Sequence, residues 1–453
     1  MMPAVELSSI ASHVGGVLQG DAASVTGLAI DSRQVHSGDL FAALPGDRVD
    51  GHDFVQAAVA SGAAGVLVRR PLALEVPQVI VDDVTAALGG VAALNRSLFH
   101  GPVVAITGSA GKTTAKNMLA AILTQAGPTV ATIGNLNNEL GVPLTLSRLT
   151  AETRFAVVEM GAGAPGDIAY LCGIAAPTVS ILLNASAAHL AHYESVQEIA
   201  DTKGEILDGL APDGIAIINA DSPYASEWFS RAQGARIVSF GLGEQADCRA
   251  LDIVYRGYQG SRFVLSCGAV SVDVELAVPG LPGVMNALGA AAAALVLGCT
   301  PEQVATGLAS YPPQPGRGLV LRADSGACVI DDTYNANPAS VKAAIDILAQ
   351  SAGRRVLILG PMLELGSDSE RLHEEVGAYS ADAGIDELWV VGETAAAIAR
   401  GFGPQAKCYP DITTAIRSLR RFTAHDTVLV KGSRGAALEA VVAALVGQGV
   451  ALC

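Results

Sequence analysis

The sequence is poor in basic and aromatic residues and contains no basic run. Its 453 residues include 28 Lys and Arg against 44 Asp and Glu, a formal net charge of −16, and aromatic residues make up 4%. Nucleic acids and anionic membrane surfaces select clustered Lys and Arg, so neither is an expected partner. A small anionic substrate would require the few basic residues to gather in one cleft.

Paired cysteine motifs and targeting segments are also missing. The seven cysteines, from Cys172 to Cys453, are scattered without any C-x-x-C spacing, which predicts neither a disulfide framework nor a zinc site. The N-terminus lacks the positive start and apolar core of a signal peptide, so we expect a cytoplasmic protein. The longest apolar tracts, 284–299 and the tail from Ala436, are too short to cross a bilayer, so we expect buried helices there.

The most informative stretch is 103–114, VVAITGSAGKTT, where an apolar β-branched run meets a glycine-rich turn and a helical pattern follows. This order predicts a strand, a phosphate-binding loop and a helix, with Lys112 facing the phosphates and the Thr113 hydroxyl reaching magnesium. Ile106 stands where the general P-loop pattern has its first glycine, so the match is to a shorter variant. The alternative is an ordinary strand-to-helix turn that carries a lysine.

Length and composition predict an α/β protein of three units. We expect a small N-terminal α/β unit (1–100), then a central P-loop-type unit (101–312) with a mostly parallel sheet and helices on both faces. A C-terminal Rossmann-like α/β unit (313–453) completes the chain. The boundaries are indicated by His100-Gly101-Pro102 and by the prolines at 312, 313 and 315.

Polar residues follow the predicted strands where each strand ends. In the central unit these strands cover 103–107, 155–159, 179–184, 215–219 and 236–240, and the polar residues are Thr107, Glu159, Asn184, Asn219 and Asp221. In the last unit the strands 327–330, 356–359, 387–391 and 428–430 lead into 331–337, 360–364, 392–393 and 431–434. Open α/β sheets bind ligands at these ends, so we expect the polar groups of the central unit to converge on one crevice.

Several of these residues have ordinary interpretations when taken singly. His189 could cap a strand loop, Lys203 could be a solvated helix lysine, and the polar segment before Val55 could be a surface turn. No G-x-G-x-x-G follows any predicted strand, so a nicotinamide cofactor is not supported.

A set of motifs spread over the whole chain resembles the Mur ligase family. The motifs are TGSAGKTT (107–114), TIGNLNNELGVPLTL (132–146), VVEMGA (157–162), NASAAHL (184–190), KGEI (203–206), PGR (315–317), DDTYNANP (331–338) and VLVKGSRG (428–435). IDSRQVHSGDLFAAL and DGHDF extend the resemblance to the N-terminal unit.

The resemblance implies how ATP and magnesium would bind. ATP phosphates would be held by Gly108, Ser109, Ala110, Gly111, Lys112, Thr113 and Thr114. Two magnesium ions would be held by Thr113, Glu159, His189 and Lys203, the last as a carbamate formed with carbon dioxide. Arg317 would reach the nucleotide phosphates, and Asn286, Asp332, Asn335 and Asn337 would meet the rest of the nucleotide. The catalytic set would be Lys112, Glu159, His189, Lys203 and Arg317.

The resemblance also assigns substrate contacts. Ser32 and Arg33 would lie near a uridine nucleotide, Asn135, Asn137 and Asn138 would line a muramoyl-peptide channel, and Lys431, Ser433 and Arg434 would face a dipeptide. In one place the chain departs from the family: members often have His-Asn where Pro282-Gly283 stands here, which puts adenine contacts from that helix in question.

The implied reaction is ATP-driven amide formation. It would join D-alanyl-D-alanine to UDP-N-acetylmuramoyl-tripeptide through an acyl phosphate, giving the pentapeptide precursor of peptidoglycan. We expect a monomer without integral membrane association. Folylpolyglutamate synthetase and the ligase that adds the third peptide residue are alternatives with the same phosphate loop, and a non-catalytic nucleotide-regulated binding protein is an alternative of another class.

Overall fold

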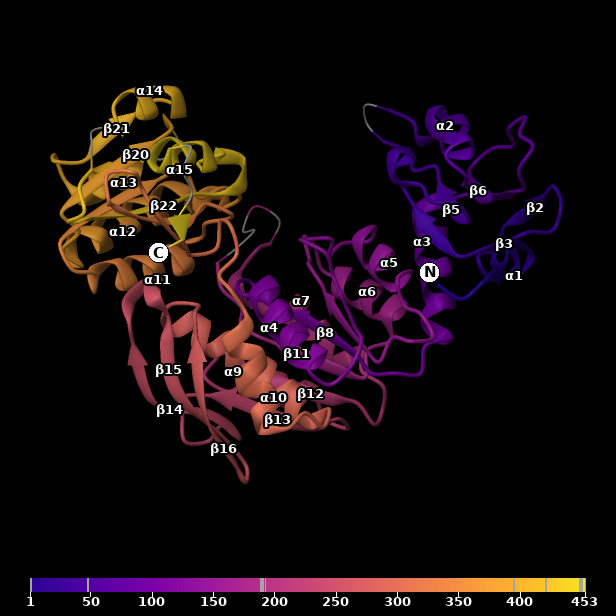
Figure 1. Ribbon diagram of the computed structural model, residues 1–453, viewed down its shortest axis with the longest axis horizontal. Coiled ribbons are helices and arrows are strands. Elements are labelled where there is room, and N and C mark those ends of the chain that lie inside the picture. Colours follow the sequence, from indigo (N-terminus) through magenta and orange to yellow (C-terminus); the bar gives the residue numbers. More distant parts are fainter. Residues whose placement is uncertain are drawn as a thin grey trace.

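Three large sheets, one in each unit, organise the protein. The computed structural model describes residues 2–46, 49–187, 191, 193–393, 396–419, 422–447 and 451–452. Figure 1 shows the N-terminal sheet at one end of the molecule, the C-terminal sheet at the other, and the nine-stranded central sheet between and below them. The predicted α/β class with three units is confirmed by this arrangement.

The N-terminal unit is built on a five-stranded sheet of order β2-β7-β6-β5-β4, parallel except for β2. Its last helix, α3, connects it to the central unit, since Asn95 Nδ2 donates to Leu146 O (2.8 Å) and Arg96 Nε donates to Ala175 O (2.8 Å). The elements are β1 (Val5–Glu6), α1 (Leu7–His13), β2 (Val17–Gln19), β3 (Ser24–Val25), β4 (Gly27–Ala29), β5 (Asp39–Ala42), α2 (Val55–Ala60), β6 (Gly65–Val68), β7 (Gln78–Ile80) and α3 (Val84–Ser97).

The central sheet has the order β16-β15-β14-β13-β12-β11-β8-β10-β9. Its elements are β8 (Val103–Thr107), α4 (Lys112–Thr124), β9 (Thr129–Ala131), α5 (Gly141–Leu146), β10 (Phe155–Glu159), α6 (Asp167–Ala175), β11 (Val179–Leu182), α7 (Val196–Asp208), β12 (Ile215–Asn219), α8 (Ala225–Arg231), β13 (Arg236–Gly241), β14 (Cys248–Tyr255), β15 (Ser261–Cys267), β16 (Val270–Leu276), α9 (Gly280–Val296) and α10 (Pro301–Ser310). Because β8 lies between β10 and β11, the loop after it opens at the switch point of the sheet, where ligands of such sheets bind.

Strand β8 is buried on both faces, and its side chains alternate between two cores. Val104 and Ile106 pack with α4, α9 and α10, whereas Val103 and Ala105 pack with α5, α6 and α7. This period of two explains why the strand reads as an unbroken apolar run. The helix expected at 284–299 is the alanine-rich, buried α9, and no helix of the described residues is long and apolar enough to cross a membrane.

The prediction of alternating strands and helices up to residue 312 is wrong at the far edge of this sheet. Strands β14, β15 and β16 form an antiparallel extension. Their alternate residues are exposed, as expected of a sheet with one solvated face. Cys248 and Cys267 lie opposite each other there and form a disulfide, which the scattered spacing of the cysteines did not predict. The partners are 19 residues apart and meet only because β14 pairs with β15.

The C-terminal sheet has the order β21-β20-β19-β22-β18-β17-β23. Strand β17 runs antiparallel to both of its neighbours, β18 and β23, and all other pairs are parallel. Its elements are β17 (Leu319–Arg322), β18 (Cys328–Asp332), α11 (Pro338–Ala349), β19 (Arg354–Leu359), α12 (Ser369–Asp382), β20 (Glu387–Val391), α13 (Ala396–Phe402), β21 (Lys407–Tyr409), α14 (Ile412–Arg417), β22 (Asp426–Lys431), α15 (Glu439–Val446) and β23 (Ala451–Leu452). The carboxyl ends of β18 and β22 lie side by side, because Asp332 pairs with Lys431 in the ladder.

Candidate active site

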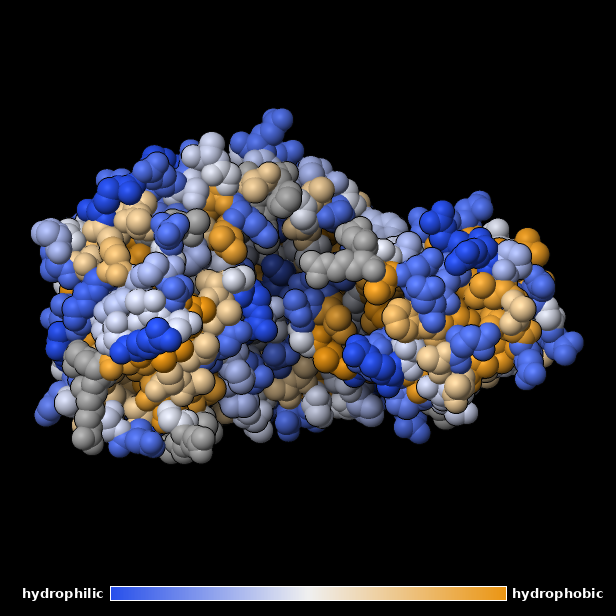
Figure 2. Space-filling model, turned by 90° about the horizontal axis from the view of Figure 1, so that it is seen from above, coloured by the Kyte–Doolittle hydropathy of each residue, from blue (hydrophilic) through white to orange (hydrophobic). Residues whose placement is uncertain are grey.

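A cleft of about 1540 Å³ lies between the central and C-terminal units. In Figure 2 the surface is hollowed near its middle, where hydrophilic residues gather. The lining includes most of the predicted site residues: Ser109, Ala110, Gly111, Lys112, Thr113, Thr114, Asn135, Asn137, Asn138, Glu159, Lys203, Asn286, Arg317, Asp332, Asn335, Asn337 and Lys431. Residues spread over more than 300 positions of the chain are therefore brought into one crevice.

The loop between β8 and α4 is fixed by its neighbours. Asn184, at the end of the next strand, accepts from Ala110 N (2.9 Å) and donates to Ala110 O (3.1 Å). Gly111 has a φ of 84°, and a Cβ there would lie 2.2 Å from Asn286 Oδ1, so a side chain is excluded. Asn286 thus touches the loop despite Pro282-Gly283 upstream. Lys112 Nζ donates to Gly108 O (2.7 Å), within the loop itself.

Glu159 ends β10 and is 1% exposed. Its Oε1 accepts a hydrogen bond from Asn137 Nδ2 (2.8 Å). Its Oε2 is buried and has no hydrogen-bond partner among the described residues, and Lys116 Nζ is 3.7 Å away. A buried carboxylate oxygen with free lone pairs beside the phosphate loop suits a hard cation such as magnesium.

Lys203 lies on α7, whose N-terminus is capped by Ser195. The side chain is buried, and no carboxylate in the described part of the chain forms an ion pair with it. Burial and the positive charge of Lys112 lower the pKa of Lys203 to about 7, although the negative charge of Glu205 acts in the opposite direction. Near neutral pH a large part of this amine is therefore uncharged and nucleophilic.

Arg317, in the linker after α10, crosses from the C-terminal unit to the phosphate loop. Its Nη2 donates to Thr113 Oγ1 (3.1 Å), and its Cζ lies 3.8 Å from the centre of the Tyr334 ring. The two segments are joined because Tyr334 N donates to Gly316 O (3.0 Å). Tyr334 was absent from the predicted site although it lies inside the DDTYNANP motif. Its ring holds the guanidinium by a cation–π contact.

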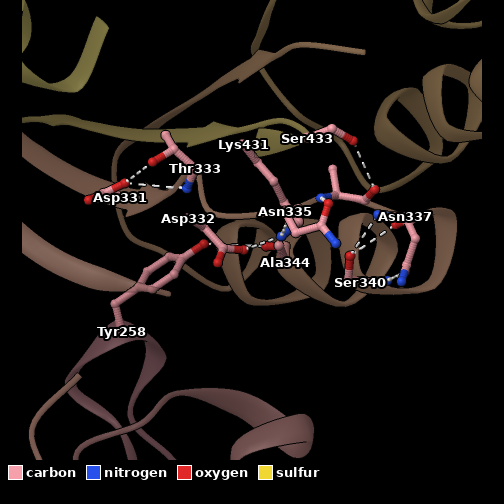
Figure 3. A network of polar contacts seen from close by, with 11 residues as sticks. Tyr258, Asp331, Asp332, Thr333, Asn335, Asn337, Ser340, Ala344, Lys431 and Ser433 are labelled. Carbon is pink, nitrogen blue, oxygen red and sulfur yellow. Dashed lines mark hydrogen bonds and ion pairs between the residues drawn. The ribbon is translucent and has the colours of Figure 1, made fainter. Parts of the chain in front are cut away.

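Figure 3 shows the strand ends of the C-terminal unit, where the polar groups bond to one another. Lys431 Nζ donates to Asp332 Oδ2 (2.6 Å) and to Asn335 O (3.0 Å). Asn337 caps α11 in a reciprocal pair with Ser340. Ser433 Oγ accepts from Leu363 N (2.9 Å) and donates to Ala336 O (3.3 Å). These contacts fix the positions of three loops at this edge.

Some predicted residues lie away from the cleft. Ser32 and Arg33 are on a short 3₁₀ helix of the N-terminal unit, where exposed Arg33 pairs with Asp31 (2.7 Å). Gly108, Ser433 and Arg434 do not line the cleft, although Gly108 O and the Arg434 guanidinium contact residues that do. His189 lies outside the described residues. Within the described residues, no three His, Cys, Asp or Glu side chains are placed to hold a metal.

The expectation that the polar strand ends of the central unit converge is corrected at two positions. Thr107 Oγ1 donates to Met160 O (2.9 Å), and the Asp221 carboxylate accepts from Leu242 N (2.6 Å) at the loop after β13. Both groups accept or donate hydrogen bonds to the backbone of the unit, and neither lines the cleft.

Sequence analysis did not identify Lys116, which is 1% exposed and lies one helical turn after Lys112. The signal that could have found it is a lysine on the apolar face of a helix.

Three family models match the chain over most of its length. They describe the Mur ligase family catalytic domain (24–96), the Mur ligase middle domain (106–294) and the Mur ligase glutamate ligase domain (316–434). The chain belongs to the Mur ligase family. The matched ranges coincide with the three sheets, so the family assignment and the architecture agree.

Mur ligases similar to this chain are known in sequence and structure. It is 41% identical over 452 residues to the UDP-N-acetylmuramoyl-tripeptide–D-alanyl-D-alanine ligase of Escherichia coli K12, covering 99% of this chain and 100% of the relative. A crystal structure of MurF from Acinetobacter baumannii superposes with a TM-score of 0.91 at 34% identity, covering 98% of this chain and 99% of that one. MurF of Thermotoga maritima, crystallised with ADP, has a TM-score of 0.82 at 30% identity and covers 93% and 97%.

Proposed function

We propose that this Mur ligase joins D-alanyl-D-alanine to UDP-N-acetylmuramoyl-tripeptide with ATP, giving UDP-N-acetylmuramoyl-pentapeptide for peptidoglycan synthesis. One observation carries the proposal: the phosphate loop, the unpartnered Glu159 oxygen, Lys203 and Arg317 meet in a cleft between two units. The choice of substrates follows the Escherichia coli relative, which is named for them and matches nearly the whole chain.

ATP is expected to bind across the cleft. Its phosphates would lie on the loop before α4, where backbone N–H groups, the helix N-terminus and Lys112 supply positive charge. Burial and the nearby Arg317 lower the pKa of Lys112, while Glu159 opposes them. A phosphate would restore the counter-charge that Lys112 lacks. The remainder of the nucleotide would meet Asn286 from one side and the segment 332–337 from the other.

Magnesium fits the oxygen groups beside the loop. The free Oε2 of Glu159 and the hydroxyl of Thr113 would hold it, with His189 and a carbamate on Lys203 as the further predicted ligands. Magnesium, when bound, offsets the charge of the phosphates so that a carboxylate can approach them. Two ions are proposed because the resemblance to the family implies two for this set of ligands.

Lys203 is proposed to act as a carbamate. Its uncharged nitrogen attacks carbon dioxide, a C–N bond forms, and the nitrogen loses a proton to solvent. The carbamate places an anion at the end of the long Lys203 side chain, where the protonated amine would be a cation. An unmodified ammonium in this position would repel the cations that the reaction needs.

The residues then serve two successive steps. A carboxylate oxygen of the tripeptide attacks the γ-phosphorus, the bond to the β-phosphate oxygen breaks, and ADP leaves while Lys112 and Arg317 balance the moving charge. The dipeptide amine attacks the acyl carbon of the resulting acyl phosphate, loses a proton, and displaces phosphate. The C-terminal unit must cover the site during both steps, since water would hydrolyse the intermediate.

The substrates are expected to divide among the units. The uridine nucleotide would bind near Ser32 and Arg33, and the peptide would run past Asn135, Asn137 and Asn138 into the cleft. The dipeptide would enter from the C-terminal side, where Lys431 and Ser433 fix the edge and exposed Arg434 can meet its carboxylate. The ranges 1–100, 101–312 and 313–453, a monomeric state and a cytoplasmic location belong to the same proposal.

The test is incubation of the protein with ATP, magnesium, UDP-N-acetylmuramoyl-tripeptide and D-alanyl-D-alanine, followed by mass analysis. We expect the pentapeptide, ADP and phosphate, each requiring both peptide substrates. Product formed with a folate and glutamate, or with the dipeptide nucleotide and a single amino acid, would assign one of the alternative ligases. Nucleotide binding without any phosphate release would indicate a regulatory protein and contradict the proposal.

A further inference from the structure

Lys116 is a buried lysine with no part in the steps above. It is 1% exposed, and a lysine is almost never buried to this extent unless its charge is paired and its N–H groups are bonded. Its Nζ donates to Thr132 O (2.7 Å) and Gly134 O (3.0 Å). Both carbonyls belong to the segment 132–138, which carries Asn135, Asn137 and Asn138 to the cleft wall.

The same segment is bonded to the end of β10. Glu159 N donates to Thr132 Oγ1 (3.0 Å), and Asn137 Nδ2 donates to Glu159 Oε1 (2.8 Å). Gly161 N donates to Asn137 O (2.8 Å), and a Cβ on Gly161 would lie 2.7 Å from Asn137 Oδ1. The segment therefore has one attachment to the strand that bears Glu159 and a second, through Lys116, to helix α4.

Apolar packing does little to hold the middle of this segment. Ile133 is 57% exposed and Leu136 is 39% exposed. Gly134 has a φ of 54°, and a Cβ there would meet no atom within 4 Å. Directional hydrogen bonds must fix the segment in place of packing. The charge-assisted ones are the two from the Lys116 ammonium and the one that the Glu159 carboxylate accepts from Asn137.

We propose that Lys116 is a positioning residue for the nucleotide-linked peptide. By holding the carbonyls of Thr132 and Gly134 against α4, it presents the three asparagine side chains to that substrate. It also joins the substrate segment to the helix whose N-terminus carries the phosphate loop, one turn before it. This inference rests on the proposed function, because it takes the muramoyl tripeptide as the ligand of the asparagines.

The primary test uses Lys116→Met in the full chain. The control lysine variant is Lys407→Met, on the exposed strand β21 and outside the lining of the cleft. Isothermal titration measures the binding of UDP-N-acetylmuramoyl-tripeptide and, separately, of a non-hydrolysable ATP analogue. Both titrations are done without magnesium, because Lys116 Nζ also lies 3.7 Å from Oε2 of Glu159, the proposed magnesium ligand. Losing two charge-assisted bonds should raise the Kd of the peptide nucleotide about tenfold or more. The Kd of the ATP analogue should change by less than about threefold, and the control should change neither. A purely structural role for Lys116 would lower the folded fraction without this split between ligands.

A second variant, Gly134→Val, keeps the test decisive if Lys116→Met fails to fold. Valine is strained at positive φ and meets open space, so it should move the Gly134 carbonyl while leaving the core intact. We again expect weaker binding of the peptide nucleotide. A variant that carries both substitutions should bind it no more weakly than the more impaired of the two single variants. A wild-type Kd in either folded variant, or fully additive effects, would overturn the role of Lys116. Failure of the unmodified protein to bind the peptide nucleotide would instead overturn the proposed function.

Discussion

The two sheets that meet at the cleft end in different ways. At the end of the C-terminal sheet the charged groups satisfy one another: Lys431 bonds to Asp332 and to a backbone carbonyl, and Ser433 bridges two loops. At the end of the central sheet they do not. Glu159 keeps a buried oxygen without a hydrogen bond, and Lys203 is buried without an ion-pair partner among the described residues.

The difference separates two kinds of sheet end. The end of the C-terminal sheet, with Asp332, Lys431 and Ser433, is a binding edge, and the end of the central sheet, with Glu159 and Lys203, is a reacting edge. Charge pairs that are complete in the free protein stabilise a fixed shape against which a nucleotide can rest. A buried carboxylate oxygen without a hydrogen bond and a buried amine without an ion pair cost stability and persist where a ligand completes them. We therefore assign the chemistry to the central edge and the rigid cover to the C-terminal edge. The following predictions change one edge at a time.

The largest effect is expected for Lys112→Ala. The substitution removes the cation that faces the β- and γ-phosphates, so kcat should fall about 10²- to 10³-fold or more. The thermal unfolding curve should stay close to that of the unmodified protein, because the side chain bonds only to its own loop. The assay is phosphate release with both peptide substrates present. Near-normal turnover by folded Lys112→Ala would remove the phosphate loop from the mechanism.

Next in size is Lys203→Ala, which should lower kcat about 100-fold by deleting a metal-ligand group. Short-chain carboxylates such as acetate should restore part of the activity, since they supply the missing anion in the space that alanine leaves. The same additions to Lys112→Ala serve as the control and should restore nothing. Full activity of Lys203→Ala in bicarbonate-free buffer would contradict a carbamate.

The smallest effect concerns stability, which should fall in a variant of the C-terminal edge but not in a variant of the central edge. In buffer free of magnesium and bicarbonate, Lys431→Met should lower the free energy of unfolding by about 2 kcal/mol, because Asp332 loses its ammonium partner. Lys203→Met should leave stability unchanged or raise it, because it removes a buried amine that has no such partner. Denaturant titration measures both. Equal losses in the two variants would erase the distinction between the edges.

Much of the central site could be predicted because it follows local sequence rules. The phosphate loop has a strand, glycines, a lysine and a helix in the required order, and Glu159 and Asn184 follow apolar strands directly. The same rule failed for Thr107 and Asp221, since a polar residue after a strand can bond to neighbouring backbone as readily as to a ligand.

The remaining features depend on contacts between distant segments. Lys116 meets carbonyls 16 and 18 positions away. Tyr334 and Arg317 belong to separate motifs, and neither motif shows that their side chains are in contact. In the sequence, β14 to β16 are short runs in which apolar and polar residues alternate. Because we expected strand–helix repeats, their antiparallel pairing was not predicted. Identifying these features required the spatial positions of the side chains.

The most direct test of the reacting edge is ¹³C NMR of the protein equilibrated with ¹³C-labelled carbon dioxide, held at constant dissolved concentration, across pH 5.5 to 9. The pKa of Lys203 is lowered to about 7, so its amine is protonated and unreactive below that pH and free above it. We predict a carbamate carbon signal that grows as the pH rises through about 7 and is absent from Lys203→Ala. No carbamate signal at pH 9, or the same signal in Lys203→Ala, would contradict the account.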